Sequence, residues 1–266
     1  MLELISSATN PIAKRVRQLA DRKHRRRQTA FLVEGLQPVW RAVEAGWDIE
    51  TFIVAPELLA KTPAAVMVAE QEQAGIAVAR LTTELFERLF DRDGPAGLAA
   101  IVRSPQRELD HLNVPPEAIF TVLHDISNPG NLGTIIRTVD AMGGAGIILV
   151  GNTTDPWSPT AVKASMGSLF AVDVVSAPDL ETFFAWTQHN HISVHATSGS
   201  AEVDHWDAQF SPPVALLMGS ERKGLPEETR NQADQCLRIP MGGTAESLNV
   251  GVAASILLYE ARRKLR

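Results

Sequence analysis

Hydrophobic and polar positions follow two alternating periodicities in the first hundred residues, and this predicts strands and helices in turn. Short apolar runs predict strands at 31–33, 48–54, 76–81 and 97–102. Helical spacing predicts helices at 10–27, 37–45, 64–74 and 82–90, with a turn from Asp91 to Pro95. Asn10 and Pro11 suit a helix start, and Thr82 or Thr83 suits another. The pattern indicates a compact α/β unit.

The same alternation returns after a polar stretch. Arg103 to Glu117 contains three prolines and predicts a linker, placed at 105–117 between a domain at 1–104 and one at 118–266. Apolar runs then predict strands at 118–123, 145–150, 171–175, 192–196, 214–218 and 237–240. Helices are expected at 132–142, 161–167 and 180–190. We therefore expect an α/β domain with a mostly parallel sheet, whose ligands bind beyond the carboxyl ends of the strands.

The stretch from Ala245 to Leu258 predicts the last helix. Ser247 is placed to cap it with its hydroxyl, and the spacing of Leu248, Val252, Ile256 and Tyr259 predicts a face turned to the core. The residues before it, I-P-M-G-G-T at 239–244, predict a strand end and a glycine loop. This is either a small polar site on a rigid scaffold or an ordinary capped helix packed on a sheet.

Composition narrows the class of protein. The chain has 266 residues, 45% of them apolar, which suits one large globular domain or two smaller ones. No apolar run approaches the ~18 residues of a membrane span, and the first residues do not resemble a signal peptide. The single cysteine, Cys236, cannot form an internal disulfide, which suits a cytoplasmic protein.

Charge is distributed unevenly. The net charge is −6, yet eight cations against Asp21 alone give residues 14–27 a formal charge of +7 and leave −13 for the rest. Such a patch favours binding to a phosphate backbone, and a solvated helix face is the alternative. The candidate RNA-binding residues are Lys14, Arg15, Arg17, Arg22, Lys23, Arg25, Arg26 and Arg27.

Three glycine-containing loops follow strands of the second domain. They read N-P-G-N-L-G-T-I-I-R at 128–137, M-G-S-E-R-K-G-L-P at 218–226 and I-P-M-G-G-T-A-E-S-L-N-V at 239–250. The phosphate-binding and dinucleotide-binding glycine motifs are both missing, as are ligand spacings for zinc or calcium, so no metal is expected. Neither Cys236 nor Ser165 has the sequence context of a nucleophile.

Together these loops resemble the SpoU (TrmH-like) RNA ribose 2′-O-methyltransferases, because three separated motifs occur in the family's order. The resemblance covers residues 118–266. The first domain resembles the family's small α/β L30e-like substrate-binding domain, through stretches at 10–19, 25–35 and 95–102. The resemblance implies a trefoil-knotted α/β methyltransferase domain, S-adenosyl-L-methionine as cofactor, and a homodimer with active sites at the subunit interface.

The resemblance also assigns residues. The polar residues of the three motifs are Asn131, Arg137, Glu221, Ser247 and Asn249, and the cofactor-binding positions are Gly219, Ile239 and Leu248, with Met241 and Thr197 as neighbours. Family members often carry a second serine where this chain has Gly251. Because glycine inside a helix costs roughly 1 kcal/mol relative to alanine, Gly251 is expected to loosen the helix start or remove one hydrogen bond.

The expected reaction is methylation of a ribose 2′-hydroxyl, in ribosomal RNA rather than transfer RNA by analogy with the family. Arg137 would contact the ribose or its phosphate and stabilise developing negative charge; a surface salt bridge is the alternative. The two asparagines and Ser247 would orient the nucleotide or hold the loops together, with helix caps and ordinary loop hydrogen bonds as the alternative. Glu221 would organise the loops by pairing with a cation, with a solvated acid as the alternative. Two other functions remain open: a catalytically weak relative that binds structured RNA, and a nicotinamide oxidoreductase, which the missing fingerprint disfavours.

Overall fold

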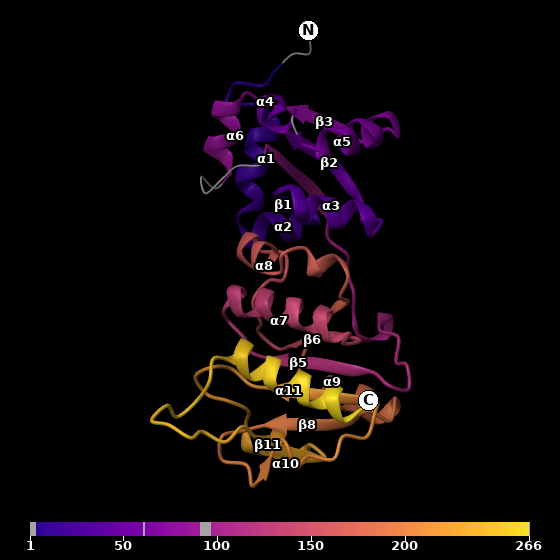
Figure 1. Ribbon diagram of the computed structural model, residues 1–266, viewed down its shortest axis with the longest axis vertical. Helices are drawn as coiled ribbons and strands as arrows, with labels where there is room; N and C mark the ends of the chain where they lie inside the picture. Colours follow the sequence, from indigo (N-terminus) through magenta and orange to yellow (C-terminus); the bar gives the residue numbers. More distant parts are fainter. Residues whose placement is uncertain (1–3, 61, 91–96, 266) are drawn as a thin grey trace. The chain divides into compact units, whose positions relative to one another are not determined.

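The computed structural model describes residues 4–60, 62–90 and 97–265, so the turn expected from Asp91 to Pro95 lies outside the described residues. The chain forms two compact units (Figure 1). The first unit consists of Met1–Pro105 and Trp157–Phe170, and the second of Gln106–Pro156 and Ala171–Arg266. The segment Trp157–Phe170 therefore packs with the first unit, although its place in the sequence put it in the second domain.

A four-stranded sheet of order β1-β4-β2-β3 lies at the centre of the first unit. β4 pairs antiparallel with β1 and β2, and β3 pairs parallel with β2. The strands are β1 (Ala30–Glu34), β2 (Ile49–Val54), β3 (Ala77–Arg80) and β4 (Leu98–Arg103). The helices are α1 (Pro11–Leu19), α2 (Arg22–Gln28), α3 (Leu36–Glu44), α4 (Pro56–Leu59), α5 (Ala64–Gln73), α6 (Thr83–Leu89), α8 (Pro159–Ala164) and the short η2 (Ser168–Phe170).

The single basic helix expected at 10–27 is wrong, because the structure contains two helices. Asn10 caps α1 as expected by accepting the N–H of Ile12 at 2.9 Å. Asp21 then accepts the N–H of Lys23 at 2.7 Å and starts α2. An aspartate side chain that bonds to the backbone two residues ahead competes with a continuous helix, so the break falls there.

Four aromatic rings of the first unit pack against one another: Phe31, Trp47, Trp157 and Phe170. The ring centroids of Phe31 and Trp157 lie 4.9 Å apart, and those of Trp47 and Phe170 lie 5.1 Å apart. The indole N–H of Trp47 donates to the carbonyl of Phe170 at 3.1 Å. The first unit therefore depends on residues distant in sequence for part of its apolar core.

The second unit contains a seven-stranded sheet of order β7-β6-β5-β10-β8-β11-β9, in which every pairing is parallel. The mostly parallel sheet expected from the sequence is confirmed. The strands are β5 (Ile119–His124), β6 (Gly146–Val150), β7 (Val174–Ala177), β8 (Ser193–Thr197), β9 (Val203–Asp204), β10 (Val214–Met218) and β11 (Gln235–Arg238). The helices are α7 (Pro129–Met142), α9 (Leu180–His189), α10 (Glu227–Gln232), α11 (Val250–Lys264) and the short η1 (Leu109–His111).

Helices cover both faces of this sheet. On one face Phe120 of β5 packs against Trp186 of α9, with ring centroids 5.5 Å apart. Successive strand residues point to opposite faces, so Ile119 and Thr121 face the other way. Helix α11 packs against β5, β10 and α7 (Figure 1). Leu109, in the predicted linker, is buried in the core of the second unit, so this stretch packs with the sheet.

The predicted core-facing side of the last helix is wrong. Val252 is 48% exposed and Tyr259 is 60% exposed. The helix begins at Val250, and its buried residues include Ala254, Leu257 and Leu258. Apolar residues occur around most of its circumference, so their spacing alone could not identify the face that meets the sheet.

Candidate active site

A chain of amide hydrogen bonds joins the three glycine-containing loops. The side-chain N–H of Asn249 donates to Asn131 Oδ1 at 3.0 Å. The side-chain N–H of Asn131 in turn donates to Glu221 Oε1 at 2.9 Å. These loops follow the parallel strands β11, β5 and β10, whose carboxyl ends lie at one edge of the sheet. The fold therefore brings Asn131, Glu221 and Asn249 together from distant parts of the sequence.

The chain of bonds has a direction. The Glu221 carboxylate only accepts hydrogen bonds, so the amide nitrogen of Asn131 must face it. The oxygen of Asn131 then faces the nitrogen of Asn249, and the oxygen of Asn249 accepts the N–H of Gly251 at 2.8 Å. Each asparagine keeps a second N–H for another acceptor. Asn249 is exposed, so its spare donor is available to a ligand.

The N-termini of α7 and α11 meet at this chain of amide hydrogen bonds. Asn128 caps α7 by accepting the N–H groups of Gly130 and Asn131 at 2.8 Å and 3.2 Å. Asn249 caps α11 through its bond to Gly251. Helix N-termini carry partial positive charge and favour anions. Asn128 was not among the expected site residues, although an asparagine before Pro129 is a recognisable helix start.

Arg137 lies on the exposed side of α7. Within the described part of the chain it makes no hydrogen bond or ion pair, so the surface salt bridge considered as an alternative is not formed with these residues. Ser247 is also exposed. The expected capping role of Ser247 is wrong, because Asn249 caps the helix two residues later. Both Arg137 and Ser247 can therefore contact a bound molecule.

Gly251 is buried at the first turn of α11. A Cβ atom at this position would lie 3.1 Å from Asn249 Oδ1 and 3.6 Å from Thr134 Cγ2. The first distance is tight, so a side chain here would press on the Asn249 amide. Gly251 thus leaves room for the Asn249 amide, whose oxygen accepts the Gly251 N–H.

Four of the five expected cofactor residues lie at three neighbouring strand ends, and the fifth, Leu248, lies just before α11. Gly219 follows β10, Ile239 and Met241 follow β11, and Thr197 ends β8. The Thr197 hydroxyl donates to the carbonyl of Leu217 at 3.2 Å, which ties β8 to β10. A Cβ atom on Gly219 would lie 2.3 Å from the carbonyl carbon of Gly224, so only glycine allows the tight fold of this loop.

These residues fit S-adenosylmethionine by their chemistry. From Ile239 to Leu248, no backbone N–H or carbonyl pairs with another backbone group of the described residues. Free backbone groups suit the edge of an adenine, and the apolar side chains of Ile239, Met241 and Leu248 suit its faces. Met241 is 36% exposed, and Ile239 and Leu248 are half-buried, so all three are accessible to a ligand.

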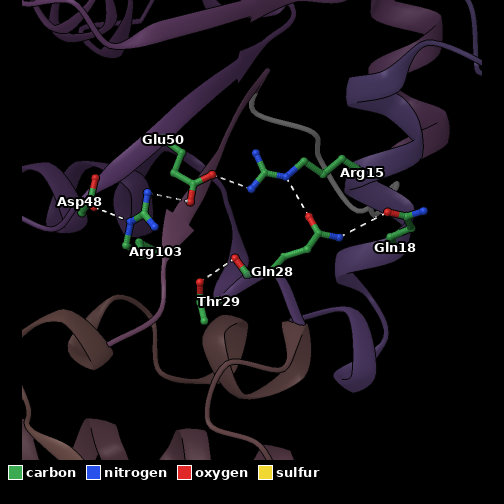
Figure 2. Close-up of polar contacts among 7 residues, drawn as sticks. All are labelled: Arg15, Gln18, Gln28, Thr29, Asp48, Glu50 and Arg103. Carbon is green, nitrogen blue, oxygen red and sulfur yellow. Dashed lines mark hydrogen bonds and ion pairs between the residues drawn. The ribbon is translucent and has the colours of Figure 1, made fainter. Parts of the chain in front are cut away.

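Two of the eight candidate RNA-binding cations, Arg15 and Arg25, are held by hydrogen bonds and ion pairs within the protein. Arg15 donates to Glu50 at 2.5 Å and to Gln28 at 3.0 Å, and Glu50 also pairs with Arg103 at 3.4 Å (Figure 2). Arg25 is only 5% exposed and donates to the carbonyls of Leu19 and Ala20. Both arginines therefore stabilise the unit.

The other cations are exposed. Arg17 donates to the carbonyl of Ala8 and stays on the surface. The remaining five are exposed residues of α1 and α2: Lys14, Arg22, Lys23, Arg26 and Arg27. The basic patch is thus smaller than the sequence indicated, and Arg15 and Arg25 hold its two helices in place.

The described residues contain no sign of a metal site, a membrane span or a cysteine nucleophile. Residues 4–60, 62–90 and 97–265 contain no group of three metal-ligating side chains. None of the helices described is long and apolar enough to span a membrane. Burial raises the pKa of the Cys236 thiol, so this cysteine is not an activated nucleophile.

Two protein families match the chain. Residues 118–259 match the SpoU rRNA Methylase family. Residues 10–100 match the MRM3-like substrate binding domain. The first match contains all three glycine-containing loops, and the second contains the basic helices.

Similar proteins carry related names. A 23S rRNA (uridine(2479)-2′-O)-methyltransferase of Streptomyces viridochromogenes is 33% identical over 92% of this chain and 87% of its own length. A 23S rRNA (guanosine(2553)-2′-O)-methyltransferase of Bacillus subtilis is 28% identical over 98% of this chain and its full length.

Solved structures give the same result. The AdoMet-bound rRNA methyltransferase from Sinorhizobium meliloti superposes with a TM-score of 0.90 at 38% identity, over 98% of this chain and 97% of that one. The AdoMet complex of AviRb from Streptomyces viridochromogenes gives a TM-score of 0.85 at 30% identity, over 96% and 98%. Given these matches and the joined motifs, the chain belongs to the SpoU rRNA methylase family.

Proposed function

We propose that this protein transfers a methyl group from S-adenosylmethionine to a ribose 2′-hydroxyl of ribosomal RNA. The observation that carries the proposal is the amide chain from Asn249 through Asn131 to Glu221, which joins three family motifs. Arg137, at the end of the first motif, is exposed on α7. The names of the similar proteins support ribosomal RNA as the substrate and a 2′-hydroxyl as the target.

The cofactor is held by Gly219, Ile239, Met241 and Leu248, with Thr197 at the next strand end. When bound, it supplies a methyl group that is already activated by the positive charge on sulfur. The main task of the protein is then to align the ribose oxygen and to stabilise the charge that develops on it.

Arg137 contacts the reacting ribose or its phosphate and stabilises negative charge on the oxygen. A guanidinium keeps its protons at neutral pH, so Arg137 acts as a charge stabiliser and not as a base. The spare amide N–H groups of Asn131 and Asn249, with the Ser247 hydroxyl, orient the nucleotide. Glu221 fixes the direction of the amide chain and so determines which groups these asparagines offer.

The first unit binds RNA phosphates through exposed residues of α1 and α2. These are Lys14, Arg22, Lys23, Arg26 and Arg27, with Arg17 beside them. Such contacts fix the position of the RNA without reading its sequence, and they weaken strongly with salt.

We further propose a cytoplasmic homodimer with a knotted methyltransferase domain. Val252 and Tyr259 lie two turns apart on the same exposed side of α11, and this side of the helix is where we place the subunit interface. Replacing Tyr259 with glutamate should convert the dimer to a monomer in light scattering. An unchanged mass would place the interface elsewhere.

The experiment that tests the activity offers the purified protein labelled S-adenosylmethionine and unmodified ribosomal and transfer RNA separately. We expect label in ribosomal RNA and resistance to alkaline cleavage at a single site. Label in transfer RNA alone would correct the substrate. Cofactor binding without transfer to either RNA, or to partly assembled ribosomal subunits, would favour the RNA-binding relative.

Arg137→Ala supplies the matched test of mechanism. We expect turnover to fall by about 10²-fold or more, the usual loss of one preorganised group that stabilises transition-state charge. Calorimetry should find S-adenosylmethionine binding unchanged. Arg88→Ala removes an exposed arginine of α6, outside the three loops, and should leave turnover near wild type. Wild-type turnover by Arg137→Ala would refute the assigned role.

A further inference from the structure

Helices α7 and α11 contact each other through polar groups at three levels. At their N-terminal ends Asn249 donates to Asn131. Midway, the hydroxyls of Thr138 and Ser255 lie 3.1 Å apart. At the C-terminal ends the Arg262 guanidinium donates from Nε to the carbonyl of Met142 at 2.8 Å. The contacts occur in the same order along both helices, so the helices run parallel.

Arg262 binds the end of α7. Besides Met142, it also donates to the carbonyl of Gly143, where the left-handed backbone, with φ of 63°, ends the helix. The last carbonyls of a helix lack partners within it and carry partial negative charge. A guanidinium offers several donors in a rigid plane and therefore suits two neighbouring carbonyls. Arg262 thus fixes the end of α7 to a defined turn of α11.

The middle contact restricts the same movement. Thr138 and Ser255 are each also within hydrogen-bond distance of a carbonyl four residues earlier in their own helix, at 3.1 Å and 2.8 Å. Their hydroxyls are therefore held close to the helix backbones. A rotation of either helix would separate this pair, which makes the contact sensitive to register.

Register matters at the N-terminal ends. Sliding one helix by a single residue displaces its side chains by about 1.5 Å along the axis. A hydrogen bond of 3.0 Å between Asn249 and Asn131 would not survive that displacement. The contacts at Arg262 and at Thr138 with Ser255 thus determine whether the two asparagines can meet.

We propose that Arg262, together with the Thr138–Ser255 pair, is a positioning element for methyl transfer. It sets the register of α7 against α11 from the C-terminal half of α7, and so holds the Asn131–Asn249 amide pair in place. This inference rests on the proposed function for its catalytic consequence. The effect on the amide pair itself is independent of any activity.

Arg262→Ala tests the proposal, with Arg263→Ala as the matched control. Arg263 is exposed and pairs with Glu260, so its removal leaves α7 untouched. We expect kcat to fall on the order of 10-fold to 100-fold in Arg262→Ala, the scale of an ångström-sized misplacement, with the Kd for S-adenosylmethionine unchanged. Arg262→Lys should restore part of the loss. Ser255→Ala gives a second variant that preserves the helix and should lower kcat in the same direction.

A double-mutant cycle separates positioning from general destabilisation. In an Asn249→Ala background, Arg262→Ala should cause no further loss of kcat, because the contact through which it acts is already gone. The proposal would be overturned if Arg262→Ala lowered kcat by the same factor in the Asn249→Ala background as in the wild type. It would also be overturned if Arg262→Ala alone kept wild-type kcat.

The amide pair is followed by NMR on protein labelled with ¹⁵N-asparagine. Arg262→Ala should shift the side-chain signals of Asn131 and Asn249, and Arg263→Ala should not. If the wild-type protein transfers no methyl group, the proposed function fails, yet this spectrum still tests the register. Unchanged asparagine signals in Arg262→Ala would reject the positioning role whatever the activity.

Discussion

Substitution of Gly219 tests the cofactor loop directly, because the atoms that an added Cβ would contact are known from the structure. In Gly219→Ala the new Cβ would lie 2.3 Å from the carbonyl carbon of Gly224 and 2.5 Å from the nitrogen of Leu225. Ordinary van der Waals contact begins near 3.4 Å. The backbone on one side of the loop must therefore move by about 1 Å, and it cannot rotate away as a side chain can.

The magnitude follows from this overlap. Overpacking of this kind costs about 1–3 kcal/mol, and here the cost is concentrated in a loop closed by the Gly224 N–H, which donates to the Ser220 carbonyl at 2.9 Å. We expect the loop to open rather than the whole unit to unfold. Loss of backbone placement at a binding site should then weaken S-adenosylmethionine binding by about tenfold or more, equal to 1.4 kcal/mol.

Gly224→Ala is the matched control in the same loop. Its φ is 65°, so alanine there is strained, yet a Cβ atom would meet nothing within 4 Å. Both variants should unfold at somewhat lower temperature, and only Gly219→Ala should lose most of its cofactor affinity. Calorimetric titration with S-adenosylmethionine and thermal unfolding make the comparison. Wild-type affinity in Gly219→Ala, or equal losses in both variants, would refute the reasoning.

Three further predictions concern buried and charged groups. Burial lowers the pKa of His195, and this effect outweighs the opposite effect of the nearby Asp234 charge. Below about pH 6.5, His195 therefore binds a proton more readily in the unfolded chain than in the folded one. The unfolding free energy should be steady above about pH 6.5 and fall as the pH drops below it, and His195→Gln should flatten this slope in denaturant titrations. Arg25→Ala should cost about 3 kcal/mol in chemical unfolding, because its two charge-assisted hydrogen bonds to the carbonyls of Leu19 and Ala20 are lost. A cost below about 1 kcal/mol would contradict the stabilising role of Arg25. Arg26→Ala should leave stability unchanged yet reduce the logarithmic salt slope of RNA binding by about one, and an unchanged slope would remove Arg26 from the interface.

The sequence by itself determined part of the local structure of this protein and the three motifs. The helix starts at Asn10 and Thr82 follow from side chains that bond to nearby backbone N–H groups, and the structure confirms both. Buried parallel strands such as Ile119–His124 and Val214–Met218 follow from short apolar runs. These features depend on neighbours in the chain, so periodicity and capping chemistry were enough to find them.

Only the tertiary structure decided which distant residues meet. Asn131 and Glu221 are 90 positions apart, and no local pattern specifies their hydrogen bond. The sequence counted Arg15 and Arg25 as part of a binding patch, whereas partners from other elements make them structural. The exposed side of α11 likewise depends on how the helix rotates against the sheet. Long-range packing selects among several locally equivalent arrangements, and that selection requires the folded chain.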